Sequence, residues 1–337
     1  MSAAPGLARQ ERLLARGETV AWHDGMDLRH WYPLYVERDA RTGAASVCWR
    51  DLGQLRFTDS FFVNTLARQP REERRVCHTP AAALAGLAGG LPPDAFIFHV
   101  SRCGSTLLTQ LLASLPRCVV MSEPPVIDSL LRLHHDQAGS GGLDTNALLR
   151  QAMLALGQRR RGDETHFFIK FDCWHIHSLA LLQQAFPQTP CLFLYREPQA
   201  VLASHQRQRG PQMVPGMLHP ALLPLPAHQI GAGDLDGYAG LVLASLFAAA
   251  QAHAAANRLV LLDYRQLPGV VFSDLLARFG IDPTPEQLQA MRERSGVHAK
   301  YGTAFHGDRQ PEPAGRLSAI AEQIQPRYQA LEALRLA

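Results

Sequence analysis

Lysine is nearly missing from this chain of 337 residues: among its 33 lysines and arginines, only Lys170 and Lys300 are lysines. A drift toward arginine in a GC-rich genome explains the bias as a whole. The two lysines that remain are of interest, because a compact ammonium and a planar guanidinium are not interchangeable. Lys170 also ends an apolar run, which makes it the stronger candidate for a functional lysine.

An excess of charge of one sign is also lacking. The formal net charge is +3, which is too small for a surface that binds nucleic acid as a whole, so no nucleic-acid partner is expected. The basic clusters at 71–75 and 159–161 are predicted to be solvated surface runs. With 47% apolar and 19% charged residues, the composition is typical of a soluble globular protein.

The six cysteines form no CxxC pair and show no regular spacing. Cys118 and Cys191 lie in apolar runs, so buried free thiols are expected rather than disulfides. The first 20 residues carry charges throughout and lack the apolar stretch of a secretory signal. The apolar segment 238–256 contains several polar residues, which favours a buried helix over a membrane span. We therefore expect a cytoplasmic protein with no membrane partner.

From Ala95 onward, short apolar runs alternate with stretches of helical periodicity. Strands are predicted at 96–100, 118–121, 166–171, 191–195 and 259–264, and helices at 106–115, 176–186, 197–209 and 235–257. Continuous apolar strands that alternate with helices indicate an α/β fold with a parallel sheet covered on both faces. Ligands of such sheets bind at the carboxyl ends of the strands.

The region before this sheet has a different character. A strand is predicted at 46–50, and Thr58 is predicted to cap a helix that contains Phe61. Residues 79–94 are expected to form a short helix and a Gly/Pro-rich boundary. We therefore predict a small α+β accessory region at 1–90, of unassigned role, followed by a main domain at 91–337.

The stretch FIFHVSRCGSTLLTQLL, residues 96–112, has the order strand, tight turn, helix start. The N–H groups and helix dipole of such a turn favour an anion. Ser105, Thr106 and Arg102 add hydroxyl and guanidinium donors. The Walker pattern is incomplete, because the turn has one glycine and no lysine. An ordinary turn in which serine and threonine cap the helix remains the alternative.

The predicted strand 191–195 is followed by REPQAVLASHQRQR. Arg196 would leave the sheet at the same edge as the turn, and Pro198 suits a first helical turn. Ser204 lies about two helical turns later, so it and Arg196 can approach one ligand group. The alternative is a helix-capping arginine and a surface serine.

Together these stretches resemble the sulfotransferases that use 3′-phosphoadenosine 5′-phosphosulfate, especially bacterial and protein-tyrosine members. SRCGSTLLTQLL resembles the family's 5′-phosphosulfate loop, REPQAVLASHQRQR its 3′-phosphate segment, and LLDYRQLPGVVFSDLLARFGI its late strand and following helix. The resemblance covers roughly residues 95–300. It implies a P-loop-like α/β fold and, without a metal, transfer of a sulfuryl group to the hydroxyl or amine of a small-molecule or peptide acceptor.

The resemblance also implies roles for individual residues. The donor-binding residues would be Arg102, Cys103, Gly104, Ser105 and Thr106 at the 5′-phosphosulfate, Arg196 and Ser204 at the 3′-phosphate, and Lys300 on a looser match. The catalytic residues would be Glu123, Lys170 and Arg102. Cys103 stands where serine or glycine is common in the family, and no role is assigned to its side chain.

Glu123 matches the glutamate that protein-tyrosine and some glycan members use as catalytic base. Burial among the apolar residues 124–126 is expected to raise its pKa toward neutrality. Lys170 and Arg102 would stabilise the charge that develops on the leaving phosphate. A helix-capping or surface carboxylate is the alternative for Glu123.

Two further segments carry hypotheses of their own. In DCWHIHS, residues 172–178, His175 and His177 would share one side of a strand, but no further spaced pair of ligands accompanies them, so no metal is predicted. The segment 210–234 is rich in proline and glycine and is a candidate lid or acceptor-binding loop.

Two other functions stay open on the sequence alone. One is an ATP-dependent phosphotransferase on the same fold, and the other is a non-catalytic nucleotide-binding module. The sequence indicates neither the acceptor nor the oligomeric state.

Overall fold

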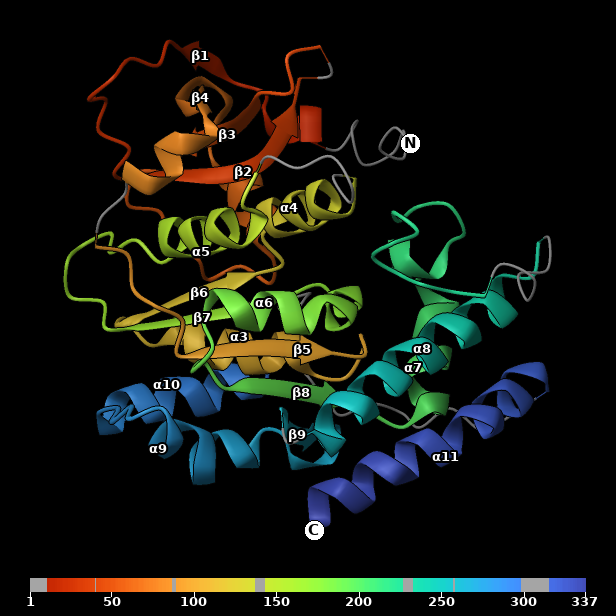
Figure 1. Ribbon diagram of the computed structural model, residues 1–337. Coiled ribbons are helices and arrows are strands. Elements are labelled where there is room, and N and C mark those ends of the chain that lie inside the picture. The colour runs from red at the N-terminus through yellow and green to blue at the C-terminus, as the bar shows by residue number, and fades with distance from the viewer. Residues whose placement is uncertain are drawn as a thin grey trace.

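Two β-sheets organise the protein, as the computed structural model shows (Figure 1). The structure describes residues 11–39, 41–86, 89–136, 143–226, 233–256, 258–297 and 315–337. The strands of the first sheet are β1 (Glu18–Val20), β2 (Trp31–Arg38), β3 (Ala45–Asp51) and β4 (Arg75–Pro80). Those of the second are β5 (Ala95–His99), β6 (Cys118–Ser122), β7 (His166–Lys170), β8 (Cys191–Tyr195) and β9 (Val260–Asp263).

Helices and tighter helical turns connect these strands. The α-helices are α2 (Phe62–Arg68), α3 (Ser105–Ser114), α4 (Pro125–Asp136), α5 (Thr145–Leu156), α6 (Leu179–Ala185), α7 (Pro198–Arg207), α8 (Leu235–Ala255), α9 (Leu276–Arg278), α10 (Pro285–Ser295) and α11 (Arg316–Leu336). The short turns are η1 (Arg71–Glu73), η2 (Ala81–Gly86), η3 (Cys173–Ser178), η4 (Pro211–Met213), η6 (Tyr264–Gln266) and η7 (Val271–Leu275).

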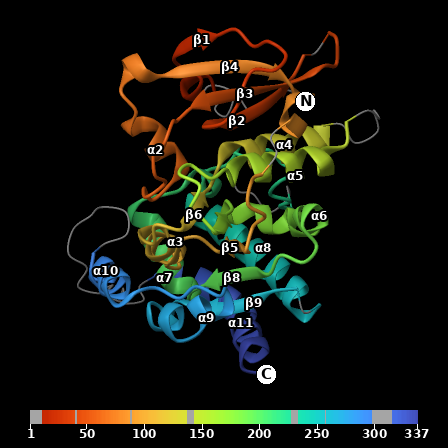
Figure 2. The same ribbon diagram turned by 90° about the vertical axis from the view of Figure 1, so that its left-hand side faces the viewer.

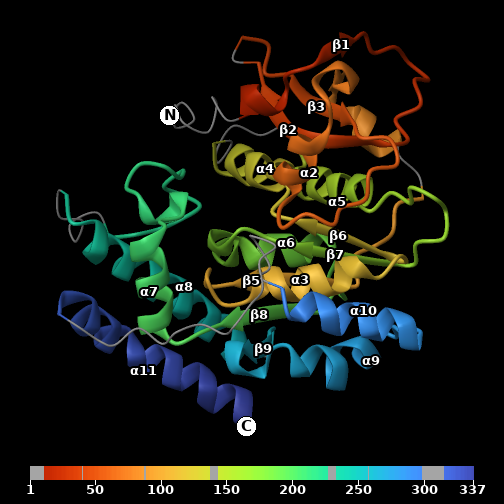
Figure 3. The same cartoon turned by 180° about the vertical axis from the view of Figure 1, so that it is seen from behind.

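The second sheet is parallel throughout, which confirms the predicted α/β fold. Its strand order is β6–β7–β5–β8–β9, and each neighbouring pair is parallel. Helix α6 covers one face and α3 the other, as opposite views show (Figures 1 and 3). After β5 the chain forms β6 and β7, which lie on one side of β5 in the strand order, and then β8 and β9, which lie on the other. The carboxyl end of β5 is therefore the switch point at which such sheets bind ligands.

The first sheet lies beyond the β6 edge of the second, with α4 and α5 between them (Figure 2). Its strand order is β1–β4–β3–β2, and β2 packs on both helices. The Val36 N–H donates to Ser129 Oγ at 2.9 Å, and Gln158 Nε2 donates to the Trp31 carbonyl at 2.7 Å. Buried apolar residues form one continuous core that extends from the first sheet through the second, so the two parts pack as neighbours in one body.

Two predicted helix starts are wrong. Thr58 does not cap a helix, because α2 begins at Phe62 and Phe61 occupies the N-cap position in an extended conformation. Asp59 holds the preceding turn outside the helix by accepting a hydrogen bond from Thr65 at 2.8 Å and pairing with Arg68 at 2.9 Å. The α-helix predicted at 176–186 likewise begins later, at Leu179 of α6, and the 3-10 turn η3 precedes it.

Helix α8 is the segment predicted to be a buried helix, and half of its apolar window is buried. It is also the one helix in the described part of the chain that is long and apolar enough, by length and composition alone, to span a membrane. Its buried side packs against α7 and α11. Helix α11 is fastened to the second sheet by Tyr328, whose hydroxyl donates to the buried Asp263 carboxylate at 2.9 Å. Glu332 of α11 adds bonds to Tyr195 and Arg265.

We predict that Gly90→Ala destabilises the protein by about 1–3 kcal/mol, the usual cost of overpacking. A Cβ atom at residue 90 would lie 2.0 Å from the Leu154 carbonyl oxygen at the end of α5, and backbone atoms cannot move aside cheaply. Urea unfolding measures the change. Gly86→Ala is the matched control, because a Cβ atom there meets nothing within 4 Å. Equal midpoints for the two variants would contradict this account of the packing.

Candidate functional site

A cavity of about 950 Å³ opens at the carboxyl ends of the second sheet. The predicted residues that line it are Arg102, Cys103, Gly104, Ser105, Thr106, Glu123, Lys170, Arg196 and Ser204. They follow β5, β6 and β8 or end β7, so the sheet itself brings them to one place. Lys300 lies outside the described residues, and its role stays a prediction. Only part of the predicted lid is described, and of that part residues 210–212 line the cavity.

Lys170 and Glu123, which both line this cavity, form an ion pair. Lys170 ends β7 and is buried, and its Nζ atom lies 2.9 Å from Glu123 Oε1. The same ammonium donates to Thr106 Oγ1 at 3.5 Å. Glu123 directly follows β6, with its N–H bonded to the Lys170 carbonyl at 2.7 Å and a left-handed φ of 55°. The ammonium thus joins the carboxylate of one strand end to the first turn of α3.

His99 approaches the same carboxylate from β5. Its Nδ1 atom accepts the Ser101 N–H at 2.9 Å, which leaves the proton of the neutral ring on Nε2. This Nε2 atom lies 3.5 Å from Glu123 Oε1. His99 is a site residue that the sequence analysis missed, since its position within an apolar strand gave no sign of its neighbour.

The expectation that Glu123 has a raised pKa is wrong. Burial does push the pKa of Glu123 upward, but the Lys170 ammonium and His99 outweigh it and hold that pKa at about 2. The carboxyl group is therefore ionised at neutral pH. The error arose because the apolar neighbours at 124–126 are visible in the sequence, whereas the ammonium comes from another strand.

Asp172 is a second carboxyl group at the same point. It follows β7 and lines the cavity. Burial, with the nearby carboxylates of Glu123 and Asp128, raises its pKa well above the usual range. A hydrogen bond with Glu123 acts in the same direction, whereas the Lys170 ammonium lowers the pKa of Asp172.

The backbone of the loop after β5 is tightly constrained. Ser101, Arg102 and Gly104 all have left-handed φ values, 70°, 52° and 82°. At Gly104 a Cβ atom would lie 2.6 Å from Leu267 and 2.9 Å from Tyr264, so only glycine fits against the turn after β9. Gly104 is the N-cap of α3 and has no side chain to bond the first N–H groups of that helix. This is the geometry in which a helix N terminus receives an anion.

Cys103 lines the cavity but is buried and belongs to the hydrophobic core. Its side chain is fully buried, and its thiol donates to the Leu194 carbonyl of β8 at 3.3 Å. Burial raises the pKa of Cys103 to about 11. The side chain therefore anchors the loop to β8, and only the backbone of Cys103 is available to a ligand.

Two arginines flank the other side of the loop. The Arg196 guanidinium lies 4.2 Å from the centroid of the Tyr264 ring and donates to the Arg102 carbonyl at 3.4 Å. Arg102 donates to the Gln208 carbonyl at 2.6 Å, which connects the loop to the end of α7. Pro198 is the first residue of α7, as predicted, and Ser204 lies on the same helix. Arg196 and Ser204 therefore border the cavity together, as their spacing indicated.

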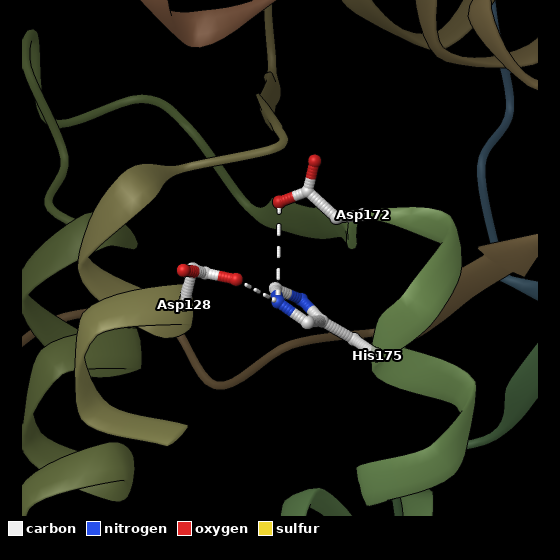
Figure 4. Close-up of side chains that lie close together, drawn as sticks. All are labelled: Asp128, Asp172 and His175. Carbon is white, nitrogen blue, oxygen red and sulfur yellow. Dashed lines mark hydrogen bonds and ion pairs between the residues drawn. The ribbon is translucent and has the colours of Figure 1, made fainter. Parts of the chain in front are cut away.

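The predicted alignment of His175 and His177 on a strand is wrong, because both lie in the 3-10 turn η3. His177 instead contacts Ser245 of α8 at 3.2 Å, and His175 contacts Asp128 of α4 at 3.0 Å. Figure 4 shows the His175 ring between the carboxyl groups of Asp128 and Asp172.

Asp128, Asp172 and His175 are grouped closely enough to hold a metal ion, with ligand atoms within 4.8 Å of one another. Asp128, however, also pairs with Arg132 at 3.0 Å and accepts from Trp174 at 2.8 Å. The contact with His175, together with these two bonds, holds the pKa of Asp128 at about 2 against the effect of burial. These contacts explain why Asp128, Asp172 and His175 lie together without invoking a metal ion. The predicted absence of a metal stays a prediction.

No family model and no curated protein matches the chain. Among solved structures, it is similar to sulfotransferase STF9 from Mycobacterium avium, with 14% identity, a TM-score of 0.48 and coverage of 76% of this chain and 79% of that one. It is similar to the sulfotransferase domain from the curacin biosynthetic pathway, with 17% identity, a TM-score of 0.45 and coverage of 72% and 99%. It is also similar to mouse sulfotransferase SULT7A1 complexed with PAP, with 10% identity, a TM-score of 0.37 and coverage of 74% of this chain and 86% of that one.

We predict that the folded protein resists thiol reagents at pH 8, because all six cysteines are buried as free thiols and burial raises the pKa of Cys103 to about 11. A thiolate is the reactive form, and little of it exists three pH units below the pKa. Titration with a chromogenic disulfide should detect all six thiols in denaturant and almost none before unfolding. Rapid labelling of Cys103 in the native protein would contradict its buried position.

Proposed function

We propose that this protein is a sulfotransferase that uses 3′-phosphoadenosine 5′-phosphosulfate and transfers its sulfuryl group to an acceptor hydroxyl or amine. One observation carries the proposal. A single cavity joins the Lys170–Glu123 pair to the loop 101–106 and to Arg196 and Ser204. The cavity thus combines a proton acceptor, an ammonium and two candidate anion-binding positions, one at the loop and one at Arg196 and Ser204.

The residues of the cavity fit such a donor. The α3 N terminus and the Thr106 hydroxyl would hold the 5′-phosphosulfate, since both offer donors to an anion. Arg196 and Ser204 would hold the 3′-phosphate, and Tyr264 keeps the Arg196 guanidinium in place from behind. A second anion site of this kind suits a nucleotide with a phosphate on its ribose.

The Lys170–Glu123 pair would supply the chemistry. Glu123 takes the proton of the acceptor as the acceptor atom bonds to sulfur. Lys170 and the α3 N terminus stabilise the phosphate oxygen that receives the electron pair when its bond to sulfur breaks. A carboxylate with a pKa of about 2 is a weak base. A bound anion beside Thr106 would share the Lys170 ammonium, which would raise the pKa of Glu123 toward the value that a base needs.

The ATP-dependent phosphotransferase retains one supporting observation. The loop itself lacks a lysine, but Lys170 reaches Thr106 from β7 and so places an ammonium at the loop. Calorimetry with adenosine 3′,5′-bisphosphate and with ATP separates the two proposals, because only a sulfotransferase site gains from the 3′-phosphate.

We predict that Glu123→Gln lowers kcat on the order of 10²–10⁴-fold, the usual contribution of a general base. Glutamine keeps the shape of the side chain but cannot take a proton. Transfer of labelled sulfate to cell extract, with mass spectrometry of the product, first identifies an acceptor and then measures the loss. Affinity for adenosine 3′,5′-bisphosphate should be retained, and unchanged turnover would exclude Glu123 as the base.

We predict that Arg196→Ala weakens binding of adenosine 3′,5′-bisphosphate about 10–100-fold, as expected for loss of a charged hydrogen bond. Adenosine 5′-phosphate, which lacks the 3′-phosphate, should lose much less affinity. Isothermal titration with both nucleotides gives the comparison. Arg278→Ala is the control, since Arg278 pairs with Asp274 on an exposed surface. Equal losses for the two nucleotides would place Arg196 elsewhere than at the 3′-phosphate.

A further inference from the structure

We infer that Phe61, a residue of the N-terminal region, positions the Lys170 ammonium for the reaction, so that this region completes the active site. The inference rests on the proposed function, in which Lys170 acts on the transferred group. It gives residues 1–90 a role that neither their composition nor their spacing indicates.

Three different kinds of group contact the Lys170 ammonium. Glu123 supplies a carboxylate at 2.9 Å, Thr106 a hydroxyl at 3.5 Å, and Phe61 an aromatic ring whose centroid lies 4.6 Å from Nζ. Lys170 is completely buried, so this small set of contacts decides where its charge lies. Phe61 lines the same cavity, together with its neighbours Ser60 and Asn64.

The segment that carries Phe61 is held against the main sheet by α3. Gln110 of this helix donates to the Thr58 carbonyl at 2.9 Å, and Arg56 donates to the Ala113 carbonyl at 3.2 Å. On the other side, Phe62 is buried and stacks on Phe57, with ring centroids 5.7 Å apart. The chain on both sides of Phe61 is therefore anchored, and one of the anchors is α3, the helix that begins at the proposed anion-binding loop.

An aromatic face suits this position better than a second polar group. Its quadrupole attracts a cation, by up to about 2 kcal/mol when the cation is desolvated. Unlike a carboxylate or a carbonyl, it neither takes an N–H bond nor cancels the charge. The ring thus orients the ammonium and excludes water from that side, and leaves the charge to act on an anion beside Thr106.

The scarcity of lysine allows a direct test of the contact in the full-length protein. Lysine labelled with ¹³C at Cε gives two signals, one for Lys170 and one for Lys300, and Lys170→Met assigns them. Protons that lie over a ring are shielded, so the Lys170 signal should be shifted upfield. Phe61→Leu should abolish this shift and Phe61→Tyr should keep it. An unchanged Lys170 signal in Phe61→Leu overturns the placement of Phe61, whether or not the protein transfers sulfate.

A double-mutant cycle then tests the effect on the reaction. Phe61→Leu should lower kcat about tenfold in the wild-type background, within the range of a buried cation–π contact. In the Lys170→Met background the same change should cost less than about twofold, because the residue through which it acts is gone. Phe61→Tyr should restore most of the activity. Equal losses in both backgrounds, or a tyrosine variant no better than leucine, overturn the positioning role.

Phe62→Leu is the matched control for damage to the segment. Phe62 packs on Phe57 in the core and is not among the residues that line the cavity. Its variant should unfold at lower urea concentration but keep the kcat of the folded enzyme. Failure of the wild type to transfer sulfate to any acceptor overturns the proposed function instead, and the Lys170 signal still decides where Phe61 lies.

Discussion

The register of two neighbouring strands fixes the position of the buried Lys170–Glu123 pair. β6 and β7 pair in parallel so that Ser122 lies opposite Lys170. Glu123 then turns back at the strand end, where its N–H bonds the Lys170 carbonyl and its carboxylate meets the Lys170 ammonium. A slip of one residue would turn the lysine to the other face of the sheet. Three further features are arranged around this pair: the loop after β5, the carboxyl group of Asp172 and the ring of Phe61.

The buried charges of the site are tolerable because they form one connected network. Lys170 pairs with Glu123, Glu123 hydrogen-bonds to Asp172, and His175 links Asp172 to Asp128. The chain of contacts continues from Asp128 to Arg132, which contributes a positive charge and pairs in turn with Glu11. An isolated buried charge is costly, whereas a paired and hydrogen-bonded one is retained. The site is thus specified by mutual compensation rather than by any single strong bond.

Much of the fold and part of the site were predictable from the sequence, because their signals are local. The strands of the second sheet are continuous apolar runs, and the residues that follow them must meet at one edge. Phe61 was not predictable, since it lies 109 positions before Lys170 and reaches it only because Arg56 and Thr58 are hydrogen-bonded to α3. The depressed pKa of Glu123 was missed for the same reason. Its cause, the Lys170 ammonium, is adjacent only in the folded sheet.

The bonds between α11 and the second sheet have a consequence for biosynthesis. Tyr195, which immediately precedes Arg196, and Asp263, which precedes Tyr264, are both held by residues 328–332. A nascent chain can form these bonds only after that stretch has left the ribosome exit tunnel. The strand ends that precede Arg196 and Tyr264 are therefore completed late, and an incomplete chain would lack a finished cavity even with its sheet already formed.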